Sequence, residues 1–155
     1  MDSENLQQFI DCHNIAADII RLEKHTLTVE DAARALDVET GQIIKSLVFQ
    51  VHGDPILVIN NGLARVDRKK LAAYLGVGRK KVKFADPDQV LDMTGFIVGS
   101  MPPFGHTKQL RTLMDPAVIR QKTVYGGGGD INAMMKIDMD VLLKATRAEV
   151  TELSE

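Results

Sequence analysis

The stretch that decides the fold is Ile43-Ile-Lys-Ser-Leu-Val-Phe-Gln-Val51, which is followed by His52-Gly-Asp-Pro55 and then by Ile56-Leu-Val-Ile-Asn60. Both outer runs are rich in β-branched residues, and the segment between them contains glycine, aspartate and proline, which favour turns. This pattern predicts a β-hairpin. It also places one charged residue, Lys45, near the start of an otherwise apolar strand.

Helices are predicted on both sides of this hairpin from apolar residues at helical spacing and from residues that cap helix ends. Thr28 and Asp31 frame a capping box, and Asp86-Pro87 combines a cap residue with a proline in the first turn. The predicted helices run over 6–22, 29–36 and 67–74, a short helix begins at 86–87, and a last helix follows Asp138 or Asp140.

Further strands are predicted over 96–98, 112–114, 123–125 and 132–137. Several connections are shorter than the crossover that parallel strands need, so part of the sheet must be antiparallel. A chain of 155 residues fits one domain. We therefore expect an α/β (α+β) fold: a single compact domain over residues 1–155, with a mixed, partly antiparallel, barrel-like sheet flanked by helices.

The composition is that of an ordinary globular protein, with 45% hydrophobic and 26% charged residues. The single cysteine, Cys12, excludes an intrachain disulfide. No apolar stretch approaches the roughly 20 residues of a membrane-spanning helix, and the acidic N-terminus differs from a secretory signal. We expect a cytoplasmic protein without a membrane partner.

Positive charge is concentrated in residues 65–83, which contain eight basic residues and one acid, although the net charge of the chain is −2. A basic segment of this kind is typical of a surface that meets a polyanion. A solvated lysine-rich helix surface explains it equally well. The residues that would contact nucleic acid are Arg68, Lys69, Lys70, Arg79, Lys80 and Lys81.

Lys45 is the first candidate functional residue, because an ammonium group is rarely buried in a strand unless it has a partner. It could be a cation at the rim of a pocket, aimed at a phosphate or a developing oxyanion. Alternatively, its aliphatic stem covers the core while its charged head reaches water. The strand pattern alone favours this second interpretation.

Two glycine-containing loops are further candidates. Residues 99–106 (Gly-Ser-Met-Pro-Pro-Phe-Gly-His) combine glycines, two adjacent prolines, a hydroxyl and an imidazole, which could form a rigid pocket wall or an ordinary turn. Residues 126–130 (Gly-Gly-Gly-Gly-Asp) could present backbone amides to an anion or a carbonyl, or form a flexible hairpin.

Other chemistries lack support in the sequence. The four histidines are scattered, no metal-ligand spacing occurs, and neither a nucleotide-binding glycine motif nor a nucleophile elbow is found. We therefore expect no metal and no cofactor. The chain has no tryptophan and two tyrosines, so platforms for stacking bases are poorly supplied. Any nucleic acid is expected to be held through phosphates and one terminal nucleotide.

Taken in order, these segments resemble the YbaK/EbsC family of trans-editing aminoacyl-tRNA deacylases, relatives of the editing domain of bacterial prolyl-tRNA synthetases. The resemblance covers about residues 28–150, and the common order of five short motifs makes it specific. The motifs are Thr28-Val-Glu-Asp-Ala-Ala33, Gln42-Ile-Ile-Lys-Ser-Leu-Val48, Val66-Asp-Arg-Lys-Lys-Leu-Ala72, Thr94-Gly-Phe96 with Gly99 to Gly105, and the glycine loop that leads into Ile131.

This resemblance implies a pocket for the aminoacylated C-C-A end of a tRNA, and hydrolysis of the ester of a small amino acid such as Cys or Ala on tRNA-Pro or a similar tRNA. Lys45 would be the key catalytic residue, and the backbone amides of Gly128 and Gly129 would hold the carbonyl or its oxyanion. The implied substrate-binding residues are Ser46, Gly99, Ser100, Pro103, Gly105, His106 and Asp130.

The family pattern leaves alternatives open. Some alanine-specific relatives carry asparagine in place of Ser46, and some relatives carry serine or histidine in place of Asp130. The attacking group is a water oriented by Ser46, Ser100 or His106, the ribose 2′-hydroxyl, or a substrate thiol. A prolyl-tRNA synthetase is a candidate partner. The rival interpretation is a non-catalytic module that binds tRNA ends or a synthetase.

Overall fold

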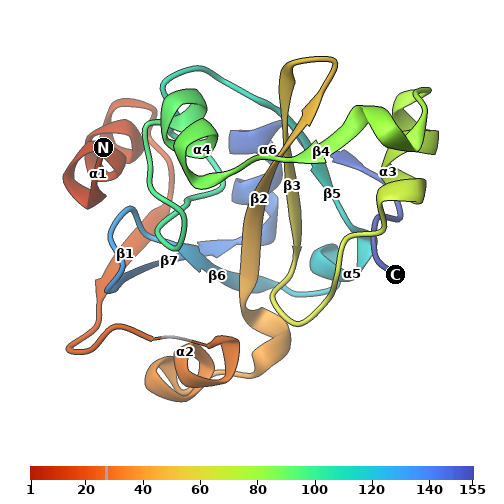
Figure 1. Ribbon diagram of the computed structural model, residues 1–155. Coiled ribbons are helices and arrows are strands. Elements are labelled where there is room, and N and C mark those ends of the chain that lie inside the picture. Colours follow the sequence, from red (N-terminus) through yellow and green to blue (C-terminus); the bar gives the residue numbers. More distant parts are fainter. Residues whose placement is uncertain (27) are drawn as a thin grey trace.

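The predicted hairpin forms the centre of the structure (Figure 1). In the computed structural model, which describes residues 1–26 and 28–155, strand β2 (Ile44–Val51) pairs antiparallel with β3 (Asp54–Asn61) over the full length of both strands. His52 and Gly53 form the turn, and both have positive φ angles, of 52° and 82°. Two-residue hairpin turns favour this backbone geometry because it matches the twist of the strands.

Two sheets are built around this hairpin, where the sequence predicted one. The five-stranded sheet has the order β4 (Val82–Phe84), β2, β3, β5 (Arg111–Met114) and β8 (Glu149–Val150). It is mixed, because β3–β5 and β5–β8 are parallel pairs while the other pairs are antiparallel. The antiparallel three-stranded sheet has the order β1 (Ala17–Arg21), β7 (Ala133–Asp138) and β6 (Thr123–Gly127). The mixed α+β class is thereby confirmed.

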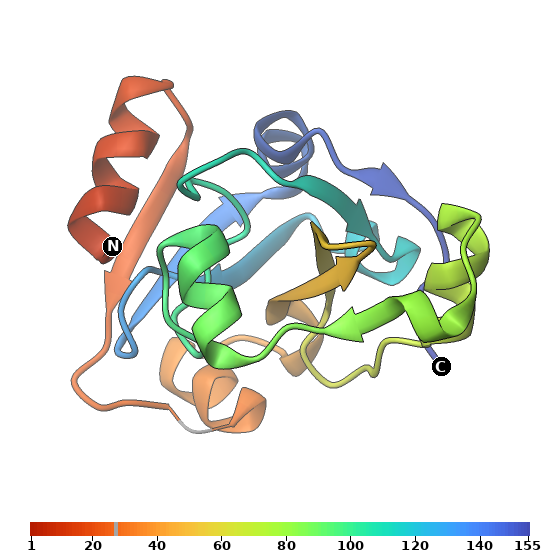
Figure 2. The same cartoon turned by 45° about the horizontal axis from the view of Figure 1, so that its top comes forward.

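Helices surround the sheets on several sides, with α1 and α3 at opposite ends of the molecule (Figures 1 and 2). Several predicted caps are confirmed: Thr28 accepts a hydrogen bond from the amide of Asp31, and Asp67 and Asp86 accept from amides in their own first turns. The helices are α1 (Ser3–Cys12), α2 (Val29–Leu36), α3 (Arg68–Leu75), α4 (Pro87–Thr94), α5 (Pro116–Ile119) and α6 (Met139–Thr146), with short 3-10 turns at Thr40–Gln42 and Arg79–Lys81.

Two element predictions are wrong. The helix predicted over 6–22 stops at Cys12, Asn14 turns the chain with a positive φ of 53°, and the rest forms the edge strand β1. Asparagine tolerates this left-handed conformation better than most residues. The strand predicted over 96–98 is an irregular segment after Gly95, in which Phe96 is buried while Ile97 and Val98 are exposed.

The alternation of side chains along β2 divides the core and positions the site. Ile44 and Val48 belong to one buried cluster, while Phe49 and Val51 belong to another on the opposite face of the sheet. Because successive strand residues point to opposite faces, Ser46 lies on the face of Ile44 and Val48. Lys45 lies on the other face.

Asp115, which is 5% exposed, fixes the C-terminal segment to the five-stranded sheet, directly after strand β5. Burial alone would raise the pKa of this carboxyl, but hydrogen bonds from the amides of Leu153, Ala117 and Ser154 and from the Ser154 hydroxyl hold the pKa below its usual range. The charged form of Asp115 therefore stabilises the native fold.

We predict that Asp115→Asn lowers the free energy of unfolding by about 2–4 kcal/mol at neutral pH, because hydrogen bonds to a charged acceptor contribute about 1.5–3 kcal/mol each. A carboxyl group whose pKa is lower in the folded state than in the unfolded state stabilises the fold at pH values above its unfolded-state pKa. This stabilisation is lost as the pH falls through the folded-state pKa. The deficit should therefore shrink near pH 3. Urea denaturation at both pH values measures it, with the exposed Asp18→Asn as control. A deficit that persists unchanged in acid contradicts this account.

Candidate functional site

A hollow opens where the edge of β2 lacks a partner strand. At one end of this edge, β4 pairs only with Phe49, Gln50 and Val51. At the other end, just before β2 begins, an isolated parallel bridge joins Ile43 to Tyr125. Within the described residues, no strand pairs with the stretch between these two contacts on that edge. The space beside it is a cavity of about 490 Å³.

The cavity is mainly apolar and is bounded by parts of both sheets and two helices. Helices α2 and α4 contribute to its wall; in Figure 1, α2 lies at the lower end of β2 and α4 toward its upper end. We call this cavity the apolar hollow. Its lining residues are His25, Thr26, Thr28, Val29, Ala32, Ile43, Ile44, Lys45, Ser46, Leu47, Val48, Phe84, Val90, Val98, Gly99, Met101, Gly127, Ile131, Ala133 and Met134.

Ser46 presents a buried hydroxyl to this hollow. The residue is 9% exposed, and in the described part of the chain its Oγ has no hydrogen-bond partner. Buried hydroxyls are almost always hydrogen-bonded, since leaving one unpaired costs about 1–3 kcal/mol. In the described residues, the Ser46 hydroxyl is thus an unpaired polar group in the wall of the hollow.

Lys45 lies where the apolar hollow meets a second depression. That depression, which we call the basic groove, runs along the other face of β2 toward α3. Lys45, Leu47 and Phe84 line both. The remaining residues of the groove are Phe49, Ala64, Arg65, Val66, Asp67, Arg68, Lys69, Arg79 and Glu155.

The basic segment is divided by the fold. Arg68, Lys69 and Arg79 line the groove beside Lys45. Lys80 and Lys81 lie outside the groove and line a second surface depression with His52, which Arg68 and Arg79 also line. The amine of Lys70 donates to the carbonyl oxygen of Ser154 at 2.7 Å, which ties it to the C-terminal segment.

The four glycines end strand β6 and begin its hairpin connection to β7, and they are tightly packed there. A side chain at Gly127 would place its Cβ 2.1 Å from the carbonyl oxygen of Met101, and one at Gly128 would lie 2.6 Å from the backbone of Ala133. The amide of Gly128 donates to Ala133 and that of Gly129 donates to Ser100, each at 3.0 Å. The predicted use of these two amides as oxyanion donors does not fit this structure, because backbone carbonyls already occupy them.

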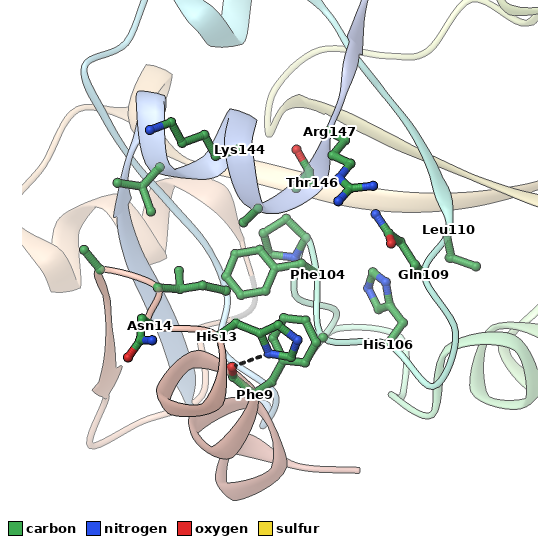
Figure 3. A pocket seen from close by; sticks show the side chains of 16 residues that line it. Phe9, His13, Asn14, Phe104, His106, Gln109, Leu110, Lys144, Thr146 and Arg147 are labelled. Atoms are coloured by element: carbon green, nitrogen blue, oxygen red, sulfur yellow. Dashed lines mark hydrogen bonds between the residues drawn. The ribbon is translucent and has the colours of Figure 1, made fainter.

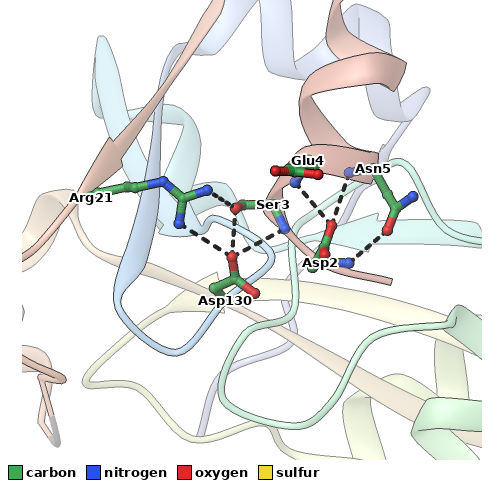
Figure 4. Close-up of polar contacts among 6 residues, drawn as sticks. All are labelled: Asp2, Ser3, Glu4, Asn5, Arg21 and Asp130. Atoms are coloured by element: carbon green, nitrogen blue, oxygen red, sulfur yellow. Dashed lines mark hydrogen bonds and ion pairs between the residues drawn. The ribbon is translucent and has the colours of Figure 1, made fainter.

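Asp130 and Ser100 hold the backbone around the hollow rather than lining it. The Asp130 carboxylate accepts hydrogen bonds from the hydroxyl and amide of Ser3 and pairs with Arg21 (Figure 4). The hydrogen bond from the Ser3 hydroxyl lowers the pKa of Asp130 more than any other contact does. Ser100 is fully buried, and its hydroxyl donates to the carbonyl of Ile97 at 2.9 Å. The substrate-binding roles predicted for Asp130 and Ser100 find no support in this geometry.

Pro103, Gly105 and His106 face a different cavity, of about 640 Å³, between α1 and α6 (Figure 3). His106 Nε2 lies 2.8 Å from the carbonyl oxygen of Pro102, so the ring donates to it and fixes the loop. Burial lowers the pKa of His106, an effect that the bond to Pro102 opposes. Of the predicted substrate-binding residues, the fold brings only Ser46 and Gly99 to the apolar hollow with Lys45.

Sequence reasoning missed several residues of the hollow. Phe84, Val98 and Ile131 are exposed apolar residues at its rim, and His25 is the other titratable side chain, besides Lys45, among the described residues that line it. The sequence signal that could have indicated Phe84 is an aromatic residue directly after the basic segment. The contributions of Val29 and Met134 depend on how the elements pack, which periodicity does not reveal.

Neither a metal cluster nor a spanning helix emerges from the described ranges. Residues 1–26 and 28–155 contain no group of three or more His, Cys, Asp or Glu side chains positioned to hold a metal ion. The helices in these ranges are also too short and too polar to cross a membrane.

The chain matches the family described as "Aminoacyl-tRNA editing domain" over residues 23–145. It is 26% identical over 129 residues to the "Putative Cys-tRNA(Pro)/Cys-tRNA(Cys) deacylase EbsC" of Enterococcus faecalis, which covers 83% of this chain and 77% of that protein. It is 31% identical over 101 residues to the proline–tRNA ligase of Thermosipho melanesiensis, covering 65% of this chain and 17% of the ligase.

A solved structure with close similarity is the "Crystal structure of a putative trans-editing enzyme for prolyl tRNA synthetase", with a TM-score of 0.92 and 30% identity over 99% of this chain and 96% of that one. Fold and sequence therefore agree. This chain belongs to the aminoacyl-tRNA editing domain family, and its similarity to the YbaK/EbsC deacylases and to prolyl-tRNA synthetases is confirmed.

We predict that Gly127→Ala lowers the free energy of unfolding by about 1–3 kcal/mol, because its Cβ would overlap the carbonyl oxygen of Met101 and force the loop to move. Gly78→Ala is the matched control, since no atom lies within 4 Å of its Cβ position and its φ is −71°. Urea denaturation of both variants measures the difference. Equal stability of the two would show that the close approach does not constrain the wall of the hollow.

Proposed function

We propose that this protein is a deacylase that hydrolyses the 3′ ester of mischarged aminoacyl-tRNA, releasing a small amino acid such as Cys or Ala from tRNA-Pro or a similar tRNA. The observation that carries the proposal is the position of Lys45 between the apolar hollow and the basic groove. An aminoacyl-tRNA end has matching parts: an amino acid side chain, an ester, and a phosphate backbone.

In this arrangement the amino acid side chain enters the apolar hollow and the tRNA backbone follows the basic groove. Walls formed by Val29, Ala32 and Met134 favour a small apolar or weakly polar side chain. A hydrophobic pocket discriminates one methylene by only about 1–3 kcal/mol, so larger side chains are rejected better than smaller ones. Ser46 supplies a hydrogen bond to a polar group of the bound end.

The chemistry proposed is charge stabilisation by Lys45 and not general base catalysis by the protein. No carboxylate lies among the described lining residues, His106 lies in the other cavity, and the imidazole that does line the hollow, His25, belongs to an exposed residue. Lys45 binds the terminal phosphate or polarises the ester carbonyl as negative charge develops on its oxygen. Attack by a bound water releases the amino acid and leaves a free 3′-hydroxyl. Attack by a substrate thiol releases a thiolactone, and attack by the ribose 2′-hydroxyl moves the ester to the 2′ oxygen, from which a water then releases the amino acid. None of these routes needs a carboxylate from this site.

The family and two of the relatives support this direction. The protein from Enterococcus faecalis is described as a "Putative Cys-tRNA(Pro)/Cys-tRNA(Cys) deacylase", and the closely similar solved structure is described as "a putative trans-editing enzyme for prolyl tRNA synthetase". We therefore propose aminoacyl-tRNA as the substrate and a prolyl-tRNA synthetase as a candidate partner.

The first test is a deacylation panel with Ala-, Cys-, Ser-, Thr- and Pro-charged tRNAs. We predict release from one or two of them by the wild type, and a fall of about 100-fold or more in kcat/KM for Lys45→Ala, the effect of losing one oxyanion contact in other enzymes. Lys83→Ala, an exposed lysine on the adjacent strand β4, is the control and should retain activity. Binding of tRNA without turnover by the wild type would favour the non-catalytic module instead.

Salt dependence tests the groove separately. Neutralising Lys69 and Arg79 to glutamine should reduce the slope of log K against log salt for tRNA binding by about 0.7–0.9 per lost phosphate contact. The double variant Lys80→Gln with Lys81→Gln carries the same charge change outside the groove and should alter the slope less. Equal slopes for the two double variants would place the tRNA elsewhere.

A further inference from the structure

Phe84 is an exposed aromatic residue held in a fixed position. It ends strand β4 and is 51% exposed, although its partner across the strand pair, Phe49, is only 2% exposed. The two rings meet edge to face, with centroids 5.2 Å apart and an interplanar angle of 87°. Tyr74, another exposed aromatic residue, differs because its hydroxyl donates to Glu149. The Phe84 ring is therefore supported from below and open to solvent.

The position of this ring is specific. Phe84 lines the apolar hollow and also the basic groove, as do Lys45 and Leu47. Besides Lys45, four cations line the groove: Arg65, Arg68, Lys69 and Arg79. The groove also contains two acids, Glu155 and Asp67, and Asp67 accepts hydrogen bonds from the first amides of α3. An exposed ring beside a row of cations is the combination that binds single-stranded nucleic acid through stacking and phosphate contacts.

We propose that Phe84 is the stacking platform for the terminal adenine of the tRNA 3′ end, an inference that rests on the proposed function. The ester belongs to the terminal ribose, so the terminal adenine is the base nearest to an amino acid bound in the hollow. The edge of the hollow at Phe84 is where this base reaches an aromatic face. The base then covers the exposed half of the ring, and the preceding phosphates lie along the groove.

A role of Phe84 in packing alone would require a different property of the side chain than stacking does. If the ring only shields Phe49 and the end of β4, an aliphatic side chain of similar size performs the same task. Stacking requires an aromatic face, since the interaction of a base with an aromatic ring depends on both π systems. Phe84→Leu, which keeps apolar bulk, and Phe84→Trp, which keeps the aromatic face, therefore separate the two roles.

The experiment uses an uncharged acceptor-stem RNA hairpin ending in A-C-C-A, with 2-aminopurine in place of the terminal adenine. Stacking on Phe84 should quench the fluorescence on binding. Phe84→Ala and Phe84→Leu should abolish the quench and weaken binding about tenfold, from a stacking contribution of about 1–3 kcal/mol per base. Phe84→Trp should retain the fluorescence quench and the wild-type affinity. Leu91→Ala, an exposed apolar residue on α4 that lines neither depression, is the control.

The outcomes distinguish this inference from the proposed function. An unchanged quench and affinity in Phe84→Ala overturns the stacking role, whatever the deacylation panel shows. Loss of affinity in Phe84→Ala with full affinity in Phe84→Leu also overturns it, since apolar bulk alone then suffices. Quenching that depends on the aromatic ring supports the stacking role, even if the wild type hydrolyses none of the charged tRNAs.

Discussion

The arrangement of the site depends on the incomplete pairing of one strand. β2 is fully paired with β3 on one edge, but on the other edge it meets β4 only over its last three residues. A single bridge at Ile43 then ties the start of the strand to the second sheet. The edge between these contacts is where the apolar hollow opens, and it is where Lys45 and Ser46 lie. Because the two residues are consecutive, strand geometry directs them to opposite faces.

The glycines at the end of strand β6 fix the backbone on one side of the apolar hollow. Gly127 and Gly128 allow β6 to pass so close to the backbone of Met101 and Ala133 that no side chain fits between. The amide of Gly129 then donates to Ser100, which joins the strand end to the loop that forms the far wall. Asp130 continues this role by binding the start of α1. Gly127, Gly128 and Gly129 thus allow close backbone packing that residues with side chains would prevent.

The local signals in the sequence predicted the fold well, and the long-range contacts limited the prediction of the site. The hairpin, the caps at Thr28, Asp67 and Asp86, and the mixed sheet follow from turn, capping and alternation rules. The edge strand β1 was mistaken for helix because its apolar residues continue a helical pattern, and only Asn14 marked the turn. Lys45, Ser46 and Gly99 do converge. His106 and Ser100 donate to backbone carbonyls three or four residues earlier in the chain, and the amide of Gly128 donates to Ala133, five residues later. The amide of Gly129 donates to the distant Ser100. None of these engagements follows from the motifs.

The central claim is that the aminoacylated end sits across Lys45, with the amino acid in the apolar hollow. Its most direct test is a titration, followed by amide NMR shifts, with a stable analogue of the A-C-C-A end in which an amide replaces the aminoacyl ester. We predict shifts concentrated at Ser46, Gly99 and Phe84. Shifts concentrated at Phe104 to His106, in the cavity between α1 and α6, would contradict this placement.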